Sequence, residues 1–127
     1  MTTIRSIMKT ETVTVEPGDS VRRALELLIE HRISGLPVIR SDRTIVGVLS
    51  EKDILKVFYD GGDTVATLMT PHPQTIDVNA ELVDAVDTLM ANDFRRLLVH
   101  EGGKLVGILS RADLMPAILE TLISRTE

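Results

Sequence analysis

The feature that most constrains this chain is an internal duplication at an offset of about 61 residues. Ile7-Met8-Lys9 aligns with Leu68-Met69-Thr70 at that offset. Gly47-Val48-Leu49-Ser50-Glu51-Lys52-Asp53 aligns with Gly107-Ile108-Leu109-Ser110-Arg111-Ala112-Asp113 at an offset of 60, because a turn near residues 40–44 is one residue longer than its copy. Internal repeats decide the architecture before any local motif does. Only two copies are present, so the sequence predicts a pseudo-symmetric pair rather than an open array.

Each copy carries the same order of expected elements: a short lead-in segment, a brief strand, an amphipathic helix, two strands joined by a tight turn, and a closing helix. In the first copy we expect them at residues 4–8, 12–15, 21–31, 36–39, 45–49 and 51–59, and in the second at 65–69, 74–76, 80–92, 97–100, 105–109 and 111–124. We expect Asp19 or Ser20 to cap the first helix and Asn79 to cap its counterpart. Pro116 predicts a bend or a restart of the last helix.

These patterns predict an α/β (α+β) fold. The fold would consist of two β-α-β-β-α repeats, 1–62 and 63–127, packed sheet to sheet as one module. A repeat of about 60 residues makes a marginal core by itself, so we expect the two halves to share a buried interface. With 43% apolar residues but only 2% aromatic ones, that core must be aliphatic.

Composition also narrows the function. A net charge of -5 disfavours a general nucleic-acid binder, which needs a basic face. The absence of cysteine excludes disulfides, thiolate metal sites and Cys nucleophiles. His31, His72 and His100 are far apart in the sequence, and we expect no metal site. Residues 1–6 lack the long apolar stretch of a signal peptide and no run reaches membrane-spanning length, so we expect a soluble, cytoplasmic protein without a membrane partner.

Two interpretations compete for the repeated Ser-x-x-Asp motifs, Ser50 to Asp53 and Ser110 to Asp113. The first is structural, because Ser and an acidic residue three positions later form a common helix cap. The second is a ligand site, because a helix start offers amides to an anion, Ser adds a hydroxyl, and a carboxylate suits a vicinal diol such as ribose. One Ser can serve both purposes.

The order and duplication of these motifs resemble a tandem pair of cystathionine-β-synthase (CBS) domains, known as a Bateman module. The resemblance rests on Ile-Met in the lead-in, Ser34-Gly35-Leu36-Pro37-Val38 before the hairpin and Gly-h-h-Ser-x-x-Asp after it, where h is an apolar residue. It covers essentially the whole chain. It implies a regulatory sensor, not an enzyme, that requires no cofactor and binds AMP, ADP, ATP, S-adenosylmethionine or NAD in two clefts between the repeats.

The resemblance also implies which residues line each cleft. One cleft would use Ser110, Asp113, Arg111, Val13, Ile33, Ser34, Gly35 and Pro37. The other would use Ser50, Asp53, Gln74, Phe94, Arg95, Arg96 and Leu98. The Asp residues would bind ribose hydroxyls, the Ser residues and Arg side chains phosphate, and the apolar side chains adenine. Arg95 and Arg96 replace the small Ser34-Gly35 pair, so the second cleft should favour phosphorylated ligands.

The resemblance further implies a homodimer formed through outer helices at 21–31, 51–59 and 118–123, and an output passed to an unidentified protein partner. An alternative function is a CBS-fold dimerisation or interaction module that binds no small molecule. An enzyme acting on nucleotides is the weakest hypothesis, because the sequence shows no nucleophile–base pair and no phosphate-binding Gly-rich loop.

Overall fold

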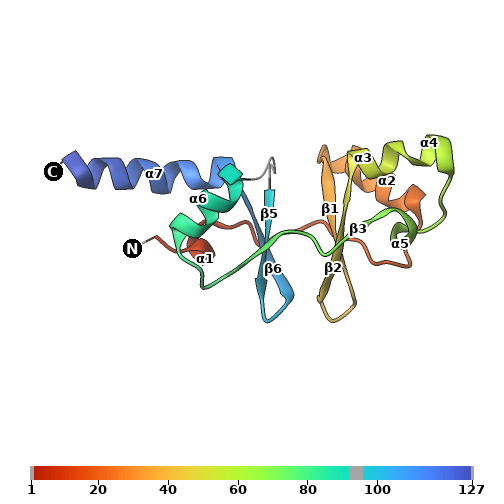
Figure 1. Ribbon diagram of the computed structural model, residues 1–127, viewed down its shortest axis with the longest axis horizontal. Helices are drawn as coiled ribbons and strands as arrows, with labels where there is room; N and C mark the ends of the chain where they lie inside the picture. Colours follow the sequence, from red (N-terminus) through yellow and green to blue (C-terminus); the bar gives the residue numbers. More distant parts are fainter. Residues whose placement is uncertain (1, 92–95, 127) are drawn as a thin grey trace. The chain divides into compact units, whose positions relative to one another are not determined.

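The structure, a computed structural model, describes residues 2–91 and 96–126 (Figure 1). Its contacts divide the chain into two compact units. The N-repeat unit comprises Val13–Pro73 and Gly103–Leu105, and the C-repeat unit comprises Met1–Thr12, Gln74–Gly102 and Val106–Glu127. Each lead-in segment therefore packs in the unit built mainly from the other repeat. The repeat boundaries at 1–62 and 63–127 remain a prediction, and the units in space follow a different division.

The N-repeat unit consists of a three-stranded sheet and four helices. Its elements are α2 (Val21–His31), β1 (Gly35–Ile39), β2 (Ile45–Ser50), α3 (Glu51–Leu55), α4 (Val57–Asp60), α5 (Val65–Leu68) and β3 (Thr70–Pro71). The sheet order is β1-β2-β3, and both pairings are antiparallel. Strand β3 belongs to the second repeat in the sequence, so the lead-in of that repeat completes this sheet.

Helix α2 shows how the local sequence shapes this unit. The Ser20 hydroxyl accepts the Arg23 amide at 3.0 Å, which confirms Ser20 as the helix cap. Helical spacing then places one apolar stripe against the sheet. The buried core is aliphatic, as expected, and consists of Val15, Ala24, Leu27, Leu28, Leu36, Val38, Leu49 and Val65.

The C-repeat unit also consists of a three-stranded sheet with helices, although its third strand pairs differently. Its elements are α1 (Ile4–Ile7), β4 (Thr75–Asp77), α6 (Leu82–Ala91), β5 (Arg96–Glu101), β6 (Lys104–Ser110) and α7 (Arg111–Thr126). The sheet order is β4-β5-β6, with β4 parallel to β5. Its core contains Ile4, Ile76, Val78, Ala85, Leu89, Leu97, Val99, Leu109 and Leu114. Ile4 comes from the lead-in of the first repeat, and α7 extends beyond its sheet in Figure 1.

Three local expectations about caps, helices and strands need correction. Helix α6 begins at Leu82, so Asn79 is not its cap and lies in the preceding turn. Asp84 instead accepts the Glu81 amide at 3.0 Å. The helix expected at 51–59 is two short helices, α3 and α4, and the strand expected at 12–15 is a single parallel bridge from Val15 to Val38.

Pro116 does not restart a helix, because α7 continues through it as one helix. Pro116 lies beyond the first turn of α7, so its missing N–H removes a hydrogen bond that the helix would otherwise make. None of the helices within the described ranges has the length and apolar character needed to cross a membrane.

Candidate functional site

Two glycines allow the lead-in segments, taken here to include Lys9 and Thr70 at their ends, to lie against the strands that end in the Ser-x-x-Asp motifs. A Cβ added at Gly47 would lie 2.9 Å from the Thr70 carbonyl oxygen. A Cβ added at Gly107 would lie 2.9 Å from the Lys9 carbonyl oxygen. Both distances are too short for any side chain, so Gly at these positions permits backbone to approach backbone. Lys9 and Thr70 therefore occupy equivalent places in the two units.

In the N-repeat unit, Ser50 and Asp53 form a reciprocal capping box at the start of α3. The amide and hydroxyl of Ser50 donate to Oδ2 of Asp53 at 2.9 Å and 3.0 Å, and the Asp53 amide donates to the Ser50 hydroxyl at 3.2 Å. The Thr70 hydroxyl lies 3.3 Å from Oδ1 and 3.4 Å from Oδ2 of the same carboxylate. Lys56 Nζ lies 3.7 Å from Oδ1. Asp53 is the one charged residue in the described part of the chain that is buried, with 4% of the whole residue exposed.

In the C-repeat unit, Ser110 and Asp113 repeat this arrangement at the start of α7. The Ser110 amide and hydroxyl donate to Oδ2 of Asp113 at 2.8 Å and 2.9 Å, and the Asp113 amide donates back to the hydroxyl at 3.3 Å. Lys9 Nζ lies 3.9 Å from Oδ1. The Asp113 side chain is 12% exposed, compared with 5% for Asp53. In both units Oδ2 is held by Ser, and Oδ1 has only longer contacts.

Several expected phosphate-binding groups already have partners. The Glu51 amide at the start of α3 donates to the Ser34 carbonyl at 3.0 Å. The Arg111 guanidinium donates to the Leu89 carbonyl at 3.3 Å. The amides of Ser110 and Asp113 are used within their own capping box. The helix starts therefore offer fewer free donors than the motif alone predicts.

The other predicted cleft residues are divided between the units. Val13, Ile33, Ser34, Gly35 and Pro37 belong to the N-repeat unit, and Gln74, Arg96 and Leu98 belong to the C-repeat unit. Pro37 and Leu98 are buried, whereas Gln74 and Arg96 are exposed. Phe94 and Arg95 lie outside the described residues. Each predicted set thus combines a Ser–Asp pair from one unit with residues of the other, and its assembly into a cleft stays a prediction.

Sequence reasoning missed Lys9, Thr70 and Lys56 as neighbours of the two aspartates. The repeat alignment places Lys9 opposite Thr70, which was a usable signal. Their proximity to Asp113 and Asp53 follows only when each lead-in crosses to the other repeat's unit. That crossing leaves no local pattern in the sequence.

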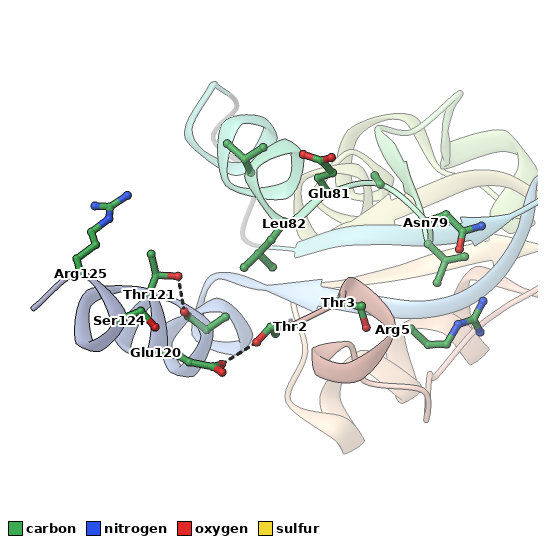
Figure 2. A pocket seen from close by; sticks show the side chains of 14 residues that line it. Thr2, Thr3, Arg5, Asn79, Glu81, Leu82, Glu120, Thr121, Ser124 and Arg125 are labelled. Carbon is green, nitrogen blue, oxygen red and sulfur yellow. Dashed lines mark hydrogen bonds between the residues drawn. The ribbon is translucent and has the colours of Figure 1, made fainter. Parts of the chain in front are cut away.

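A separate groove of about 870 Å³ lies in the C-repeat unit (Figure 2). It is bordered by Thr2 and Thr3, by the start of α6 and by the second half of α7. The Thr2 hydroxyl donates to Glu120 across it at 2.7 Å. Among residues 2–91 and 96–126, none of those predicted for ligand binding lines this groove. Over the same ranges, no group of three or more His, Asp or Glu side chains is placed to hold a metal ion.

Comparison with known proteins identifies the family of this chain. It is 36% identical to the chloroplastic CBS domain-containing protein CBSX2 of Arabidopsis thaliana over 84% of its length. It spans 58% of that protein, so the activity of the whole relative does not transfer directly. The relative is chloroplastic, and the cytoplasmic location expected here stays a prediction.

Solved structures share the fold over nearly the whole chain. A crystal structure of CBSX2 in complex with AMP matches with a TM-score of 0.85 and 37% identity, covering 95% of this chain and 98% of that one. The CBS domain pair of MJ0100, in complex with 5′-methylthioadenosine and S-adenosyl-L-methionine, matches with a TM-score of 0.79 and the same coverage. At 20% identity, that second likeness shows the fold alone. The CBS domain model matches twice, over residues 4–60 and 65–120, and the chain therefore belongs to the CBS-domain family as a tandem pair.

Proposed function

We propose that this chain is a regulatory module that senses adenosyl ligands, with AMP as the first candidate. The observation that carries the proposal is the duplicated Ser–Asp pair. In each unit the Ser residue holds Oδ2 of the aspartate through two short bonds, and Oδ1 has only contacts of 3.3 Å or longer. The relative solved with AMP, at 37% identity over almost the full chain, supports the choice of ligand.

The chemistry of the pair suits a ribose. A vicinal diol has two O–H donors, and an ionised carboxylate accepts such bonds more strongly than a neutral group does. The Ser bonds fix the carboxylate in advance, so the ligand does not have to order it. Residues that contact adenine would complete the two sites. They would be Val13, Ile33 and Pro37 for the site of Asp113, and Leu98 and Gln74 for the site of Asp53. Arg96 would contact phosphate.

Signalling would follow from linkage. A ligand that contacts residues of both repeats binds best when those residues are held together, and it raises the population of that state. A protein partner that distinguishes the two states would read the ligand concentration. This mechanism requires no catalysis and no resident cofactor.

The test is thermal unfolding of the purified chain with AMP, ADP, ATP, NAD, S-adenosylmethionine and GTP. Ligand at one hundred times its dissociation constant adds about 2.7 kcal/mol to the free energy of unfolding. For a chain of this length that is a shift of roughly 8 °C. Asp53→Ala and Asp113→Ala would each lose the shift that belongs to their own site.

A matched control is needed because these substitutions also remove a helix cap. Asp84→Ala removes a carboxylate that caps α6 and lies in neither predicted site. It should lower stability by about 1 kcal/mol and leave the ligand shift intact. The proposal is wrong if none of the six compounds shifts the unfolding temperature. It is also wrong if Asp84→Ala reduces the shift as much as the two site variants do.

A second candidate function, dimerisation or docking, is favoured by apolar side chains on the helices. Among the large apolar side chains of the N-repeat unit, the most exposed are Phe58 at 92%, Tyr59 at 89%, Ile29 at 69% and Leu55 at 68%. In the C-repeat unit Leu119, Leu122 and Ile123 of α7 are each at least half exposed. These positions coincide with the helices expected to form a homodimer. Sedimentation at micromolar concentration should give the mass of a dimer, and a monomer mass would reject the homodimer.

A further inference from the structure

We propose that Lys9 makes the Ser110–Asp113 site select adenosyl ligands that carry a phosphate over the neutral nucleoside. The inference rests on the proposed function and adds the chemical class of ligand to one of its two sites. It differs from the expectation based on Arg95 and Arg96, which assigned phosphate preference to the other site.

The backbone of Lys9 is held by two hydrogen bonds, whereas its charged end is exposed to solvent. Its amide donates to the Ile108 carbonyl at 2.9 Å, and the Ile108 amide donates back to the Lys9 carbonyl at 2.9 Å. The close approach at Gly107 keeps this pair of bonds next to the strand that leads to Ser110. The side chain of Lys9 is 71% exposed. A held backbone that carries an exposed ammonium group on a flexible four-carbon chain is suited to reaching a phosphate whose position varies between ligands.

The ion pair between Lys9 and Asp113 is a weak competitor for a ligand. The distance from Nζ to Oδ1 is 3.9 Å, at the outer limit of an ion pair. Such a long pair contributes little, because water screens the exposed ammonium group and the long lysine side chain loses entropy when it is held. A ribose diol can therefore replace Lys9 at Oδ1. The displaced ammonium group then remains beside the bound nucleoside.

Three other donors near this site already have partners. The amides of Ser110 and Asp113 close the capping box, and the Arg111 guanidinium donates to the Leu89 carbonyl. Among the described residues of the C-repeat unit, Lys9 is the lysine placed at 3.9 Å from Asp113, so its ammonium group would lie beside a phosphate attached to a ribose there. Coulomb attraction between the Lys9 ammonium group and the phosphate strengthens binding of the anionic ligand and leaves binding of neutral adenosine unchanged.

The second site provides an internal comparison. Thr70 occupies the place of Lys9 and offers Asp53 a neutral hydroxyl at 3.3 Å. The lysine near Asp53 is Lys56, which follows α3 as its C-cap, three residues after the aspartate. Its counterpart after Asp113 is Pro116, which has no charge. The two sites therefore take their nearby cation from different elements, because Lys9 comes from the end of a lead-in and Lys56 from the end of α3.

The test is isothermal titration of the full chain with AMP and with adenosine, for the wild type and for Lys9→Thr. Lys9→Thr copies the residue of the other site. It should reduce the preference for AMP over adenosine about fivefold, the effect of losing one solvent-exposed ion contact. Lys9→Arg should keep the preference. Lys104→Thr, which removes the same charge from an exposed hairpin position, is the matched control and should also keep it.

The outcomes separate this inference from the proposed function. If AMP and adenosine bind and Lys9→Thr leaves their affinity ratio unchanged, the inference fails and the sensor function stands. If Lys9→Thr weakens both ligands equally, Lys9 has a structural role only and the inference also fails. Loss of AMP binding in Asp53→Ala but not in Asp113→Ala would place the ligand away from Lys9 and overturn the inference. If neither compound binds the wild type, both proposals fail.

Discussion

The close approach of the lead-in segment at Gly107 predicts a large effect of a single methyl group. In Gly107→Ala the new Cβ would lie 2.5 Å from the Met8 sulfur and 2.9 Å from the Lys9 carbonyl oxygen. Met8 can move its flexible side chain, but the Lys9 carbonyl is held by the Ile108 amide at 2.9 Å. Relief therefore requires the lead-in to shift away from β6.

The cost can be estimated from the behaviour of other overpacked sites. Adding a carbon where no space exists destabilises by about 1–3 kcal/mol. At roughly 3 °C per kcal/mol for a chain of this length, the unfolding temperature should fall by about 3–9 °C. Part of that loss comes from the two backbone hydrogen bonds of Lys9, so its ammonium group would also move away from Asp113. Affinity for AMP should decrease together with stability.

Urea denaturation followed by circular dichroism measures the change, and the chain provides a matched control. A Cβ added at Gly18 meets nothing within 4 Å, so Gly18→Ala should change the free energy of unfolding by no more than about 0.5 kcal/mol. Gly47→Ala, which meets the Thr70 carbonyl at 2.9 Å, should behave like Gly107→Ala. Equal stability of the Gly107→Ala and Gly18→Ala proteins would refute the close packing of the lead-in against β6.

Three further predictions concern other parts of the chain. Pro116→Ala restores a donor inside α7 and should stabilise the chain by about 1 kcal/mol or more in urea denaturation; unchanged stability would contradict this. The Thr44 amide donates to Asp42 and holds the pKa of that carboxyl below its usual value. The bond therefore stabilises the fold at pH values above the usual pKa, and this stabilisation is lost as the pH falls through the lowered pKa of the folded state. A carbon-13 NMR titration should give a lower midpoint for Asp42 than for an aspartate in an unfolded peptide. Saturating AMP should slow hydrogen exchange at the paired amides of Lys9 and Ile108, and unchanged rates would separate ligand binding from the lead-in.

The repeat made most of the secondary structure predictable from the sequence. Helix α2 has the expected bounds. Strands β1 and β2 differ from expectation by one residue at one end, and β5 and β6 by one residue at each end. Errors fell where local signals are weak. Asn79 is a good cap residue, but Asp84 caps the helix from inside its first turn. Pro116 is a strong breaker, but Leu114 and Ala117 on either side of it are buried, and this packing keeps α7 continuous at the cost of one hydrogen bond.

The surroundings of the two aspartates were less predictable than the aspartates themselves. The motif Ser-x-x-Asp specifies its own capping box, because all of its atoms lie within four residues of the chain. The residues that face Oδ1 come from far along the sequence. Lys9 is more than 100 residues from Asp113, and Thr70 is 17 residues from Asp53. Their placement depends on long-range strand pairing, which local periodicity does not encode.

The exchanged lead-in segments have a consequence for sensing. Asp113 comes from the second repeat, and Lys9, which faces it in the C-repeat unit, comes from the first. In the N-repeat unit the reverse holds for Asp53 and Thr70. Each repeat therefore supplies the Ser that holds its own aspartate, and the other repeat supplies the lead-in residue that faces it. A ligand that needs both neighbours binds only while the lead-in is docked, so its binding free energy adds to the stability of that docking.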